Sequence, residues 1–218
     1  SLNKGESLGI IGPTGAGKTT LINLLMRFYE FEQGHIFIYG QNIQDLAIDQ
    51  WRSRVGLVLQ ADVIFSSSFR YNVDFGRSIS DEDFTSALKI ASAEFALEEK
   101  DLSAKGKNIS GGQKQRIMIA RAIASKPDLL ILDDSSSALD YVTEKALRDH
   151  LASNLKETTK ITISSRVASI MHCDKIIVLE DGAISACGNH QELMQKSSYY
   201  RILAAIQLDA MVGVDDDE

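Results

Sequence analysis

Short apolar runs recur along the chain and are separated by stretches with helical spacing. The runs lie at residues 7–11, 35–39, 55–59, 129–132, 160–163 and 175–179. Short apolar runs of this kind favour strands. Strands that alternate with helices are typical of a largely parallel sheet covered by helices. The pattern therefore predicts an α/β fold.

Local start and stop signals place the helical regions. Ser80 is followed by three acidic residues and predicts a helix N-terminus, because its hydroxyl can cap the first turn and the carboxylates complement the helix dipole. This helix belongs to a predicted helical subdomain at about residues 61–125. Residues 191–207 also have helical spacing, and the acidic run after them predicts a solvated tail at 213–218. We therefore expect a single domain over 1–218 that includes one helical subdomain.

Composition narrows the classes of function. With 218 residues, of which 44% are hydrophobic, the chain can bury the core of a large α/β domain. The formal net charge of −7 argues against nucleic acid as a partner, because proteins that bind nucleic acid present a basic face. Cys173 and Cys187 lie far apart and form no C-x-x-C pair, so we predict no zinc site. No apolar run approaches the roughly 20 residues of a membrane-spanning helix.

A glycine-rich loop follows the first apolar run and precedes a helical pattern. It reads GPTGAGKTT and matches the pattern G-x-x-x-x-G-K-[ST]. Glycines let the backbone wrap closely around phosphate oxygens, and a helix that starts near Lys18 adds the positive end of its dipole. Lys18 supplies a cation for the β- and γ-phosphates, and the Thr19 hydroxyl is placed to ligate Mg²⁺. The sequence therefore predicts a nucleoside triphosphate site formed by Gly12, Pro13, Thr14, Gly15, Ala16, Gly17, Lys18, Thr19 and Thr20.

A second motif, NISGGQKQR at residues 108–116, precedes a long helical segment. It resembles the signature sequence of ATP-binding cassette (ABC) proteins. The resemblance implies that this helix N-terminus points at the γ-phosphate of ATP held by the phosphate loop of a second, facing nucleotide-binding domain. Ser110 can donate a hydrogen bond to a phosphate oxygen, and the glycines let the backbone approach the anion. The residues that the resemblance assigns to the partner's ATP are Ser110, Gly111, Gly112 and Gln113.

The resemblance extends over essentially the whole chain. The strand LLILD ends in Asp133 and resembles the Walker B segment, whose carboxylate emerges where ligands of open α/β sheets bind. The resemblance implies that Asp133 holds Mg²⁺ through water and that Gln60 approaches Mg²⁺ and the attacking water. Residues 137–140 resemble the loop that crosses the interface between two such domains. Residues 61–76 resemble the stretch of exporters that contacts the transmembrane partner.

Two positions depart from the family pattern. The residue after the Walker B aspartate is usually a glutamate that polarises the attacking water, and here it is Asp134. Its side chain is one methylene shorter, and a displacement of about 1 Å can cost roughly a hundredfold in rate. Ser165 stands where the family usually has a histidine that reaches the γ-phosphate, and a serine is too short for this contact and cannot carry positive charge. We therefore expect Asp134, Gln60 and Ser165 to form a catalytic set of low activity.

These matches and departures together resemble the degenerate-site half of a heterodimeric ABC exporter. The resemblance implies a P-loop NTPase core of the RecA type with a helical subdomain and added β-strands, and ATP and Mg²⁺ as cofactors. It implies a second, non-identical nucleotide-binding domain and transmembrane domains as partners, at the cytoplasmic face of a membrane.

Other features of the chain qualify this interpretation. The chain starts close to the phosphate loop, so we expect a longer polypeptide whose preceding segment stacks on adenine. The stretch 95–108 is shorter than the family pattern leads us to expect. Two alternatives stay open, namely a soluble ABC ATPase that acts on nucleic acid or ribosomes, and a regulatory ATP-binding module with little turnover.

Overall fold

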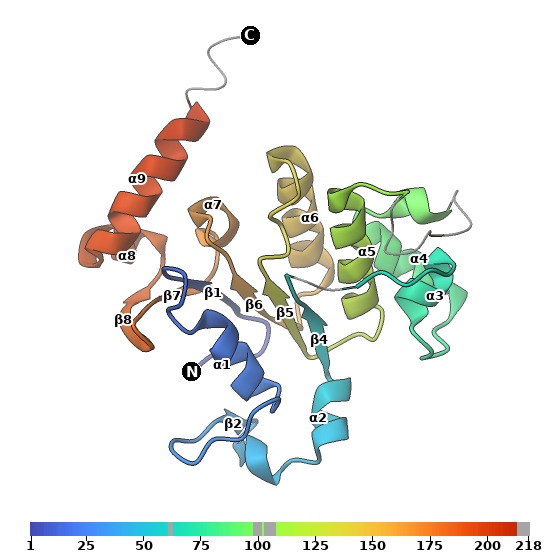
Figure 1. Cartoon of the computed structure of the whole chain (residues 1–218), viewed down its shortest axis with the longest axis horizontal. Coiled ribbons are helices and arrows are strands. Elements are labelled where there is room, and N and C mark those ends of the chain that lie inside the picture. Colours follow the sequence, from blue (N-terminus) through green and yellow to red (C-terminus); the bar gives the residue numbers. More distant parts are fainter. Residues whose placement is uncertain (61–62, 98–101, 103–107, 213–218) are drawn as a thin grey trace. The chain divides into compact units, whose positions relative to one another are not determined.

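The structure is a computed structural model and describes residues 1–60, 63–97, 102 and 108–212 (Figure 1). The chain forms two compact units. The first unit comprises residues 1–7 and 55–162, and the second comprises residues 8–54 and 163–218. Each unit contains strands, helices and a buried cluster of apolar side chains.

The parallel strands of the first unit bring Gln60 and the Walker B-like segment to the same edge of the sheet. Their order is β4 (Val55–Val58), β5 (Leu129–Asp133) and β6 (Thr159–Ile163), and the last residue of β6 belongs to the second unit. β4 and β5 are parallel. Every residue of β5 is buried, as expected for a continuous apolar strand that is covered on both faces. Because β4 and β5 run in the same direction, the residues that follow their carboxyl ends meet at the same edge.

The helices of the first unit include α5, which begins within the second motif. They are α3 (Phe69–Asp74), α4 (Asp81–Ile90), the 3₁₀ helix η2 (Glu94–Leu97), α5 (Gly111–Ile123) and α6 (Tyr141–Asn154). The predicted cap of α4 is confirmed, because the Ser80 hydroxyl accepts a hydrogen bond from the N–H of Asp83 at 3.0 Å. α5 packs against α3, α4 and β4 (Figure 1). Its buried side chains, among them Ile117 and Ile119, therefore belong to the core of this unit.

The second unit contains the strand that leads into the glycine-rich loop. β1 (Ser7–Ile11) runs parallel to β7 (Lys175–Glu180), and β7 forms an antiparallel hairpin with β8 (Ala183–Gly188). Asp181 and Gly182 make the hairpin turn with φ of 50° and 78°, a conformation that the Asp-Gly pair predicts. The other elements are α1 (Lys18–Leu25), β2 (Phe37–Ile38), β3 (Gln41–Asn42), the 3₁₀ helix η1 (Ile43–Asp45), α2 (Ile48–Ser53), α7 (Val167–Ile170), α8 (His190–Lys196) and α9 (Ser198–Val212).

Side chains of α2 satisfy the carbonyl groups at the C-terminal end of α1. The indole Nε1 of Trp51 donates to the Leu25 carbonyl at 2.8 Å. The guanidinium of Arg52 donates to the Met26 carbonyl at 3.1 Å and to the Arg27 carbonyl at 2.8 Å. The last carbonyls of a helix have no partner within the helix, so these bonds fix an end that would otherwise fray.

The predicted α/β fold with largely parallel strands is confirmed, two local predictions are corrected, and one strand was missed. The strand expected at 35–39 is limited to Phe37–Ile38, because Tyr39 and Gly40 adopt positive φ and turn the chain into β3. The single helix expected at 191–207 is two helices, since Ser197 is extended between α8 and α9. β8 was not predicted, because its mostly exposed residues form no continuous apolar run.

Some predictions have no structural counterpart. The acidic tail 213–218 and most of the stretch 95–108 lie outside the described residues. The division of 1–218 into one domain with a helical subdomain at 61–125 stays a prediction. Over the described ranges, no helix combines the length and the apolar character needed to cross a bilayer.

Candidate functional site

The glycine-rich loop connects β1 to α1 by a path that requires glycine at specific positions. A Cβ atom at position 12 would overlap the carbonyl oxygen of Leu179, so the loop leaves β1 in direct contact with β7. Gly15 and Gly17 have φ of 84° and 98°, in the left-handed region that side chains disfavour. Gly17 is also the N-cap of α1, and no side-chain cap is made there in the described part of the chain. The first-turn N–H groups of such a helix attract an anion, helped by the helix dipole.

Lys18 lies over the same loop. Its Nζ donates to the carbonyl oxygens of Gly12 and Pro13, each at 2.8 Å. An ammonium group has three donors, so two bonds to the loop leave a third for a phosphate oxygen. The loop itself is closed by further backbone bonds, from Ala16 N–H to the Pro13 carbonyl and from Gly182 N–H to the Ala16 carbonyl, both at 3.2 Å. This geometry fits the phosphates of a nucleotide.

Ser165 lies in the same unit as this loop. It is exposed on the turn between β6 and α7. The preceding residue, Ser164, donates its N–H to the Ile10 carbonyl at 3.2 Å, and Ile10 lies in the strand that enters the glycine-rich loop. The turn that carries Ser165 is therefore anchored beside the start of the loop.

The first unit brings Gln60 and Asp134 together. Gln60 follows β4 and Asp134 follows β5, and the Gln60 Nε2 donates to Asp134 Oδ2 at 3.3 Å. Asp134 has φ of 48°, a left-handed conformation that aspartate tolerates better than most residues. Asp133, the last residue of β5, is buried. The sequence analysis named Gln60, Asp133 and Asp134 separately as candidate site residues. It did not predict the hydrogen bond between Gln60 and Asp134.

The N-terminus of α5 carries a reciprocal cap. The Ser110 hydroxyl oxygen accepts from the N–H of Gln113 at 3.1 Å, and the side-chain oxygen of Gln113 accepts from the N–H of Ser110 at 2.8 Å. This capping box satisfies two N–H groups and holds the serine in one place. Because the hydroxyl oxygen accepts in this bond, its hydrogen is left to donate to an anion.

The two glycines of this motif have a role within the chain that the sequence did not indicate. A Cβ atom at Gly112 would lie 3.1 Å from the carbonyl oxygen of Ala138 and 3.2 Å from the Leu139 side chain. A Cβ atom at Gly111 would lie 3.3 Å from the Cβ of Ala138. The glycines thus let the predicted interface loop pack closely on α5.

Gln115 is a residue that the sequence analysis missed. This buried side chain of α5 donates to the hydroxyl of Ser137 and accepts from the N–H of Ala138, both at 3.2 Å. It therefore holds the residues that resemble the interface loop. Its place within the second motif is the signal that could have indicated it.

Asp140, at the end of the same loop, caps α6. Its carboxylate accepts from the N–H of Thr143 at 2.9 Å and from the Thr143 hydroxyl at 2.8 Å. The bond from the Thr143 N–H is the larger cause and the hydroxyl bond the next, and both lower the pKa of Asp140. The carboxylate is therefore ionised and fixed at the helix start, where it complements the dipole.

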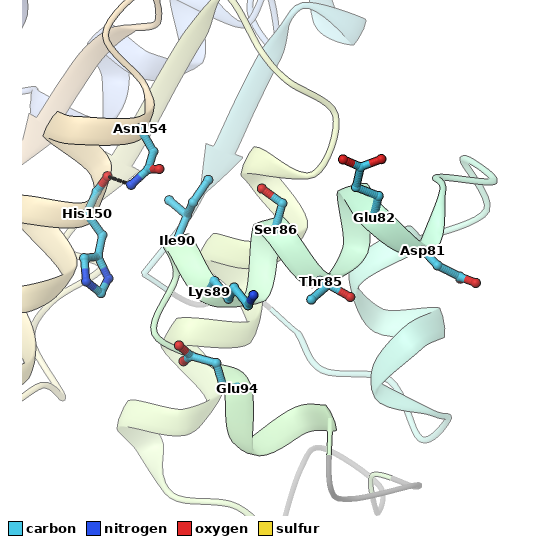
Figure 2. Close-up of a pocket in the computed structure, with 9 residues that line it drawn as sticks. All are labelled: Asp81, Glu82, Thr85, Ser86, Lys89, Ile90, Glu94, His150 and Asn154. Carbon is cyan, nitrogen blue, oxygen red and sulfur yellow. Dashed lines mark hydrogen bonds between the residues drawn. The ribbon is translucent and has the colours of Figure 1, made fainter.

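A separate hollow of about 710 Å³ lies between α4 and α6, in the first unit. Figure 2 shows His150 and Asn154 of α6 on one side of it and side chains of α4 on the other. It contains none of the predicted site residues. Three of its lining residues, Asp81, Glu82 and Glu94, are acidic and would repel phosphate groups. The hollow is therefore a poor candidate for a nucleotide site.

The chain resembles known proteins over nearly its whole length. A family model described as ABC transporter matches residues 1–137. Putative multidrug export ATP-binding/permease proteins of Staphylococcus aureus, strains NCTC 8325 / PS 47 and COL, are 39% identical over 214 residues. These matches cover 95% of this chain and 37% of each relative. The solved structure of a bacterial Atm1-family ABC exporter with ATP bound matches with a TM-score of 0.90 and 32% identity, covering 94% of this chain and 38% of that chain.

Proposed function

Because the chain belongs to the ABC transporter family, we propose that it is the ATP-binding domain of an exporter and that it holds Mg-ATP with little hydrolysis at its own site. The chain spans 37% of the length of the relatives it matches, so the transmembrane domains are expected outside it. One observation carries the proposal. The phosphate loop has the geometry of an anion site, whereas Asp134 and Ser165 occupy the two positions where chemistry needs a longer or a charged side chain.

The proposed ATP site consists of groups that bind the phosphates, groups that would hold Mg²⁺ and a group that orients water. The glycine-rich loop and Lys18 would bind the phosphates. Thr19, Gln60 and Asp133 would hold Mg²⁺, which would neutralise charge on the phosphate oxygens. Asp134 is the group available to orient the attacking water. Its carboxylate is one methylene shorter than a glutamate, and it is engaged by Gln60 at 3.3 Å. We therefore infer slow hydrolysis at this site.

The proposed role of the second motif concerns the partner domain. Ser110, Gly111, Gly112 and Gln113 begin a capped helix. In the proposed arrangement these residues would contact the ATP bound to the facing chain. The defects at Asp134 and Ser165 belong to this chain's own site, so the partner's site, completed by this helix, stays competent. This asymmetry supports a non-identical partner chain.

Exposed aromatic side chains of the first unit support a docking surface for the transmembrane domains at the cytoplasmic face of the membrane. Phe65, Tyr71 and Phe75 are exposed by 42%, 48% and 47%. The rings of Phe65 and Phe75 lie 5.4 Å apart, and those of Tyr71 and Phe75 lie 6.4 Å apart. Arg121 of α5 places its guanidinium 5.0 Å from the Phe75 ring. A contiguous exposed apolar surface of this kind marks an interaction site.

Restoring the two family residues tests the proposed function. We expect Asp134→Glu combined with Ser165→His to raise hydrolysis at this chain's own site by at least about tenfold, since a positioned base contributes roughly a hundredfold or more. The longer carboxylate reaches the water, and the imidazole contacts the γ-phosphate. Hydrolysis is measured in the full complex after the partner's own site has been silenced.

The two single variants are the controls, and each is expected to recover less activity than the double variant. Turnover at background level in the double variant, with ATP bound, would show that the two departures do not limit this site. That result would favour a regulatory module that clamps its partner without turnover.

A further inference from the structure

The turn that carries Ser165 is held by a side chain of the C-terminal helix α9. The N–H of Val167 donates to the Oε1 of Gln207 at 2.7 Å, and the Nε2 of Gln207 donates to the carbonyl oxygen of Ser165 at 2.9 Å. A primary amide offers a donor and an acceptor side, so one glutamine can hold a backbone C=O and a backbone N–H at once. These bonds fix the peptide groups on both sides of Arg166.

The other end of the turn is fixed to the strand that enters the phosphate loop. Ser164 donates its N–H to Ile10 at 3.2 Å, and the Ser164 hydroxyl accepts from the N–H of Arg166 at 3.0 Å. Two of the bonds around Ser165 therefore come from the end of β6, and the other two come from Gln207. Without the glutamine, the half of the turn that follows Ser165 would lose these two bonds to α9.

Helix α9 is itself fixed by buried side chains and by its contact with α7. Its residues Tyr200 and Ala204 are fully buried and share a cluster with Ile11, Val167 and Ile170. The hydroxyl of Tyr200 lies 2.8 Å from the Nδ1 of His190 in α8. α9 packs against α7, the helix that begins directly after the turn (Figure 1). Gln207 thus projects from a helix that is anchored to the same core as Ile11, the residue before the phosphate loop.

We propose that Gln207 is a positioning residue of the nucleotide site, which sets the direction in which residue 165 projects toward the γ-phosphate. Through this side chain, α9 controls the contact that the turn offers to ATP. The inference rests on the proposed function, because it requires ATP in the phosphate loop. A displacement of about 1 Å at a reacting group can cost roughly a hundredfold, so loosening this turn has a measurable effect.

Amide hydrogen exchange tests, without nucleotide, whether the two hydrogen bonds of Gln207 hold the turn. Gln207→Met keeps the side-chain length and removes both hydrogen bonds, and Gln195→Met makes the same change at an exposed position of α8. In the full chain we expect Gln207→Met to speed exchange at Val167 by about tenfold, the factor that corresponds to the loss of about one hydrogen bond. The amides of α9 and those of the Gln195→Met variant keep their protection. Unchanged exchange at Val167, or equal loss of protection along α9, would overturn the inference.

Nucleotide preference tests the effect on the site. Ser165→His gives the turn a side chain that can reach the γ-phosphate, so it should increase the preference for ATP over ADP in equilibrium titration. Adding Gln207→Met should remove most of this gain and leave ADP affinity unchanged, whereas a role in stability alone would lower Tm and leave the preference intact.

The outcomes separate this inference from the proposed function. If Ser165→His prefers ATP over ADP equally with and without Gln207→Met, the positioning role is contradicted. It is also contradicted if Ser165→His does not increase the preference for ATP over ADP. A chain that fails to bind ATP contradicts the proposed function, and hydrogen exchange at Val167 still decides whether Gln207 holds the turn.

Discussion

Gly112→Asp is expected to nearly abolish ATP hydrolysis by the complex of this chain with its partner. In the proposed arrangement the N-terminus of α5 serves ATP on the facing chain, so an aspartate at 112 puts negative charge against a γ-phosphate. Loss of one donor to a developing negative charge costs on the order of a hundredfold in rate, and repulsion adds to that loss. ATP binding at this chain's own loop should survive. Steady-state hydrolysis by the reconstituted pair, measured beside photolabelling of each chain, provides the readout.

Gly112→Ala is the matched control for this variant. Any Cβ at this position crowds the carbonyl of Ala138 at 3.1 Å, so alanine tests the crowding without the charge. We expect the alanine variant to keep more activity than the aspartate variant, and both should be checked for Tm. Full turnover with Gly112→Asp would contradict the composite site. A chain that acts alone would have only the low activity set by Asp134 and Ser165, and the variant would change it little.

Lys18→Ala is expected to weaken ATP binding by at least about tenfold, because a hydrogen bond to a charged group contributes roughly 1.5–3 kcal/mol and about 1.4 kcal/mol corresponds to tenfold in Kd. Lys18 is the cation of the glycine-rich loop, and its Nζ also holds the carbonyls of Gly12 and Pro13. The variant removes both the charge and these bonds. Equilibrium titration with labelled ATP measures the change in Kd.

Two comparisons complete this test. Lys196→Ala removes an exposed lysine of α8 and should leave the Kd for ATP unchanged. Lys18→Met keeps most of the side-chain length without the charge, and its Kd should be close to that of Lys18→Ala. An unchanged Kd in both Lys18 variants would mean that ATP binds elsewhere.

The sequence predicted the features that depend on residues close together in the chain. The glycine-rich loop could be predicted because its glycines, Lys18 and the following helix lie within a few residues of one another, and the structure has them in the expected order. The cap by Ser80 has the same origin, and the turn at Asp181 and Gly182 likewise depends on two adjacent residues. Local chemistry determines these features, so a single sequence is enough to predict them.

The remaining features depend on which distant segments meet. The bond between Gln60 and Asp134 joins residues 74 positions apart, and it exists because β4 lies beside β5. Gln115 and Gln207 bind to backbone groups of other elements, and a backbone group has no side-chain signature in the sequence. A glutamine in a helical pattern is usually solvated, so neither residue could be distinguished from a surface position by spacing alone.

Helix α1 is restrained at both of its ends, and this has a mechanical consequence. It starts at the phosphate loop, and Trp51 and Arg52 hold its last carbonyls. Eight residues of α-helix span about 12 Å and bend little over that length. A shift of the loop when nucleotide arrives or leaves should therefore move α2 as part of the same rigid body. The residues Ile48–Ser53 would then change orientation with the nucleotide state although they lie outside the glycine-rich loop.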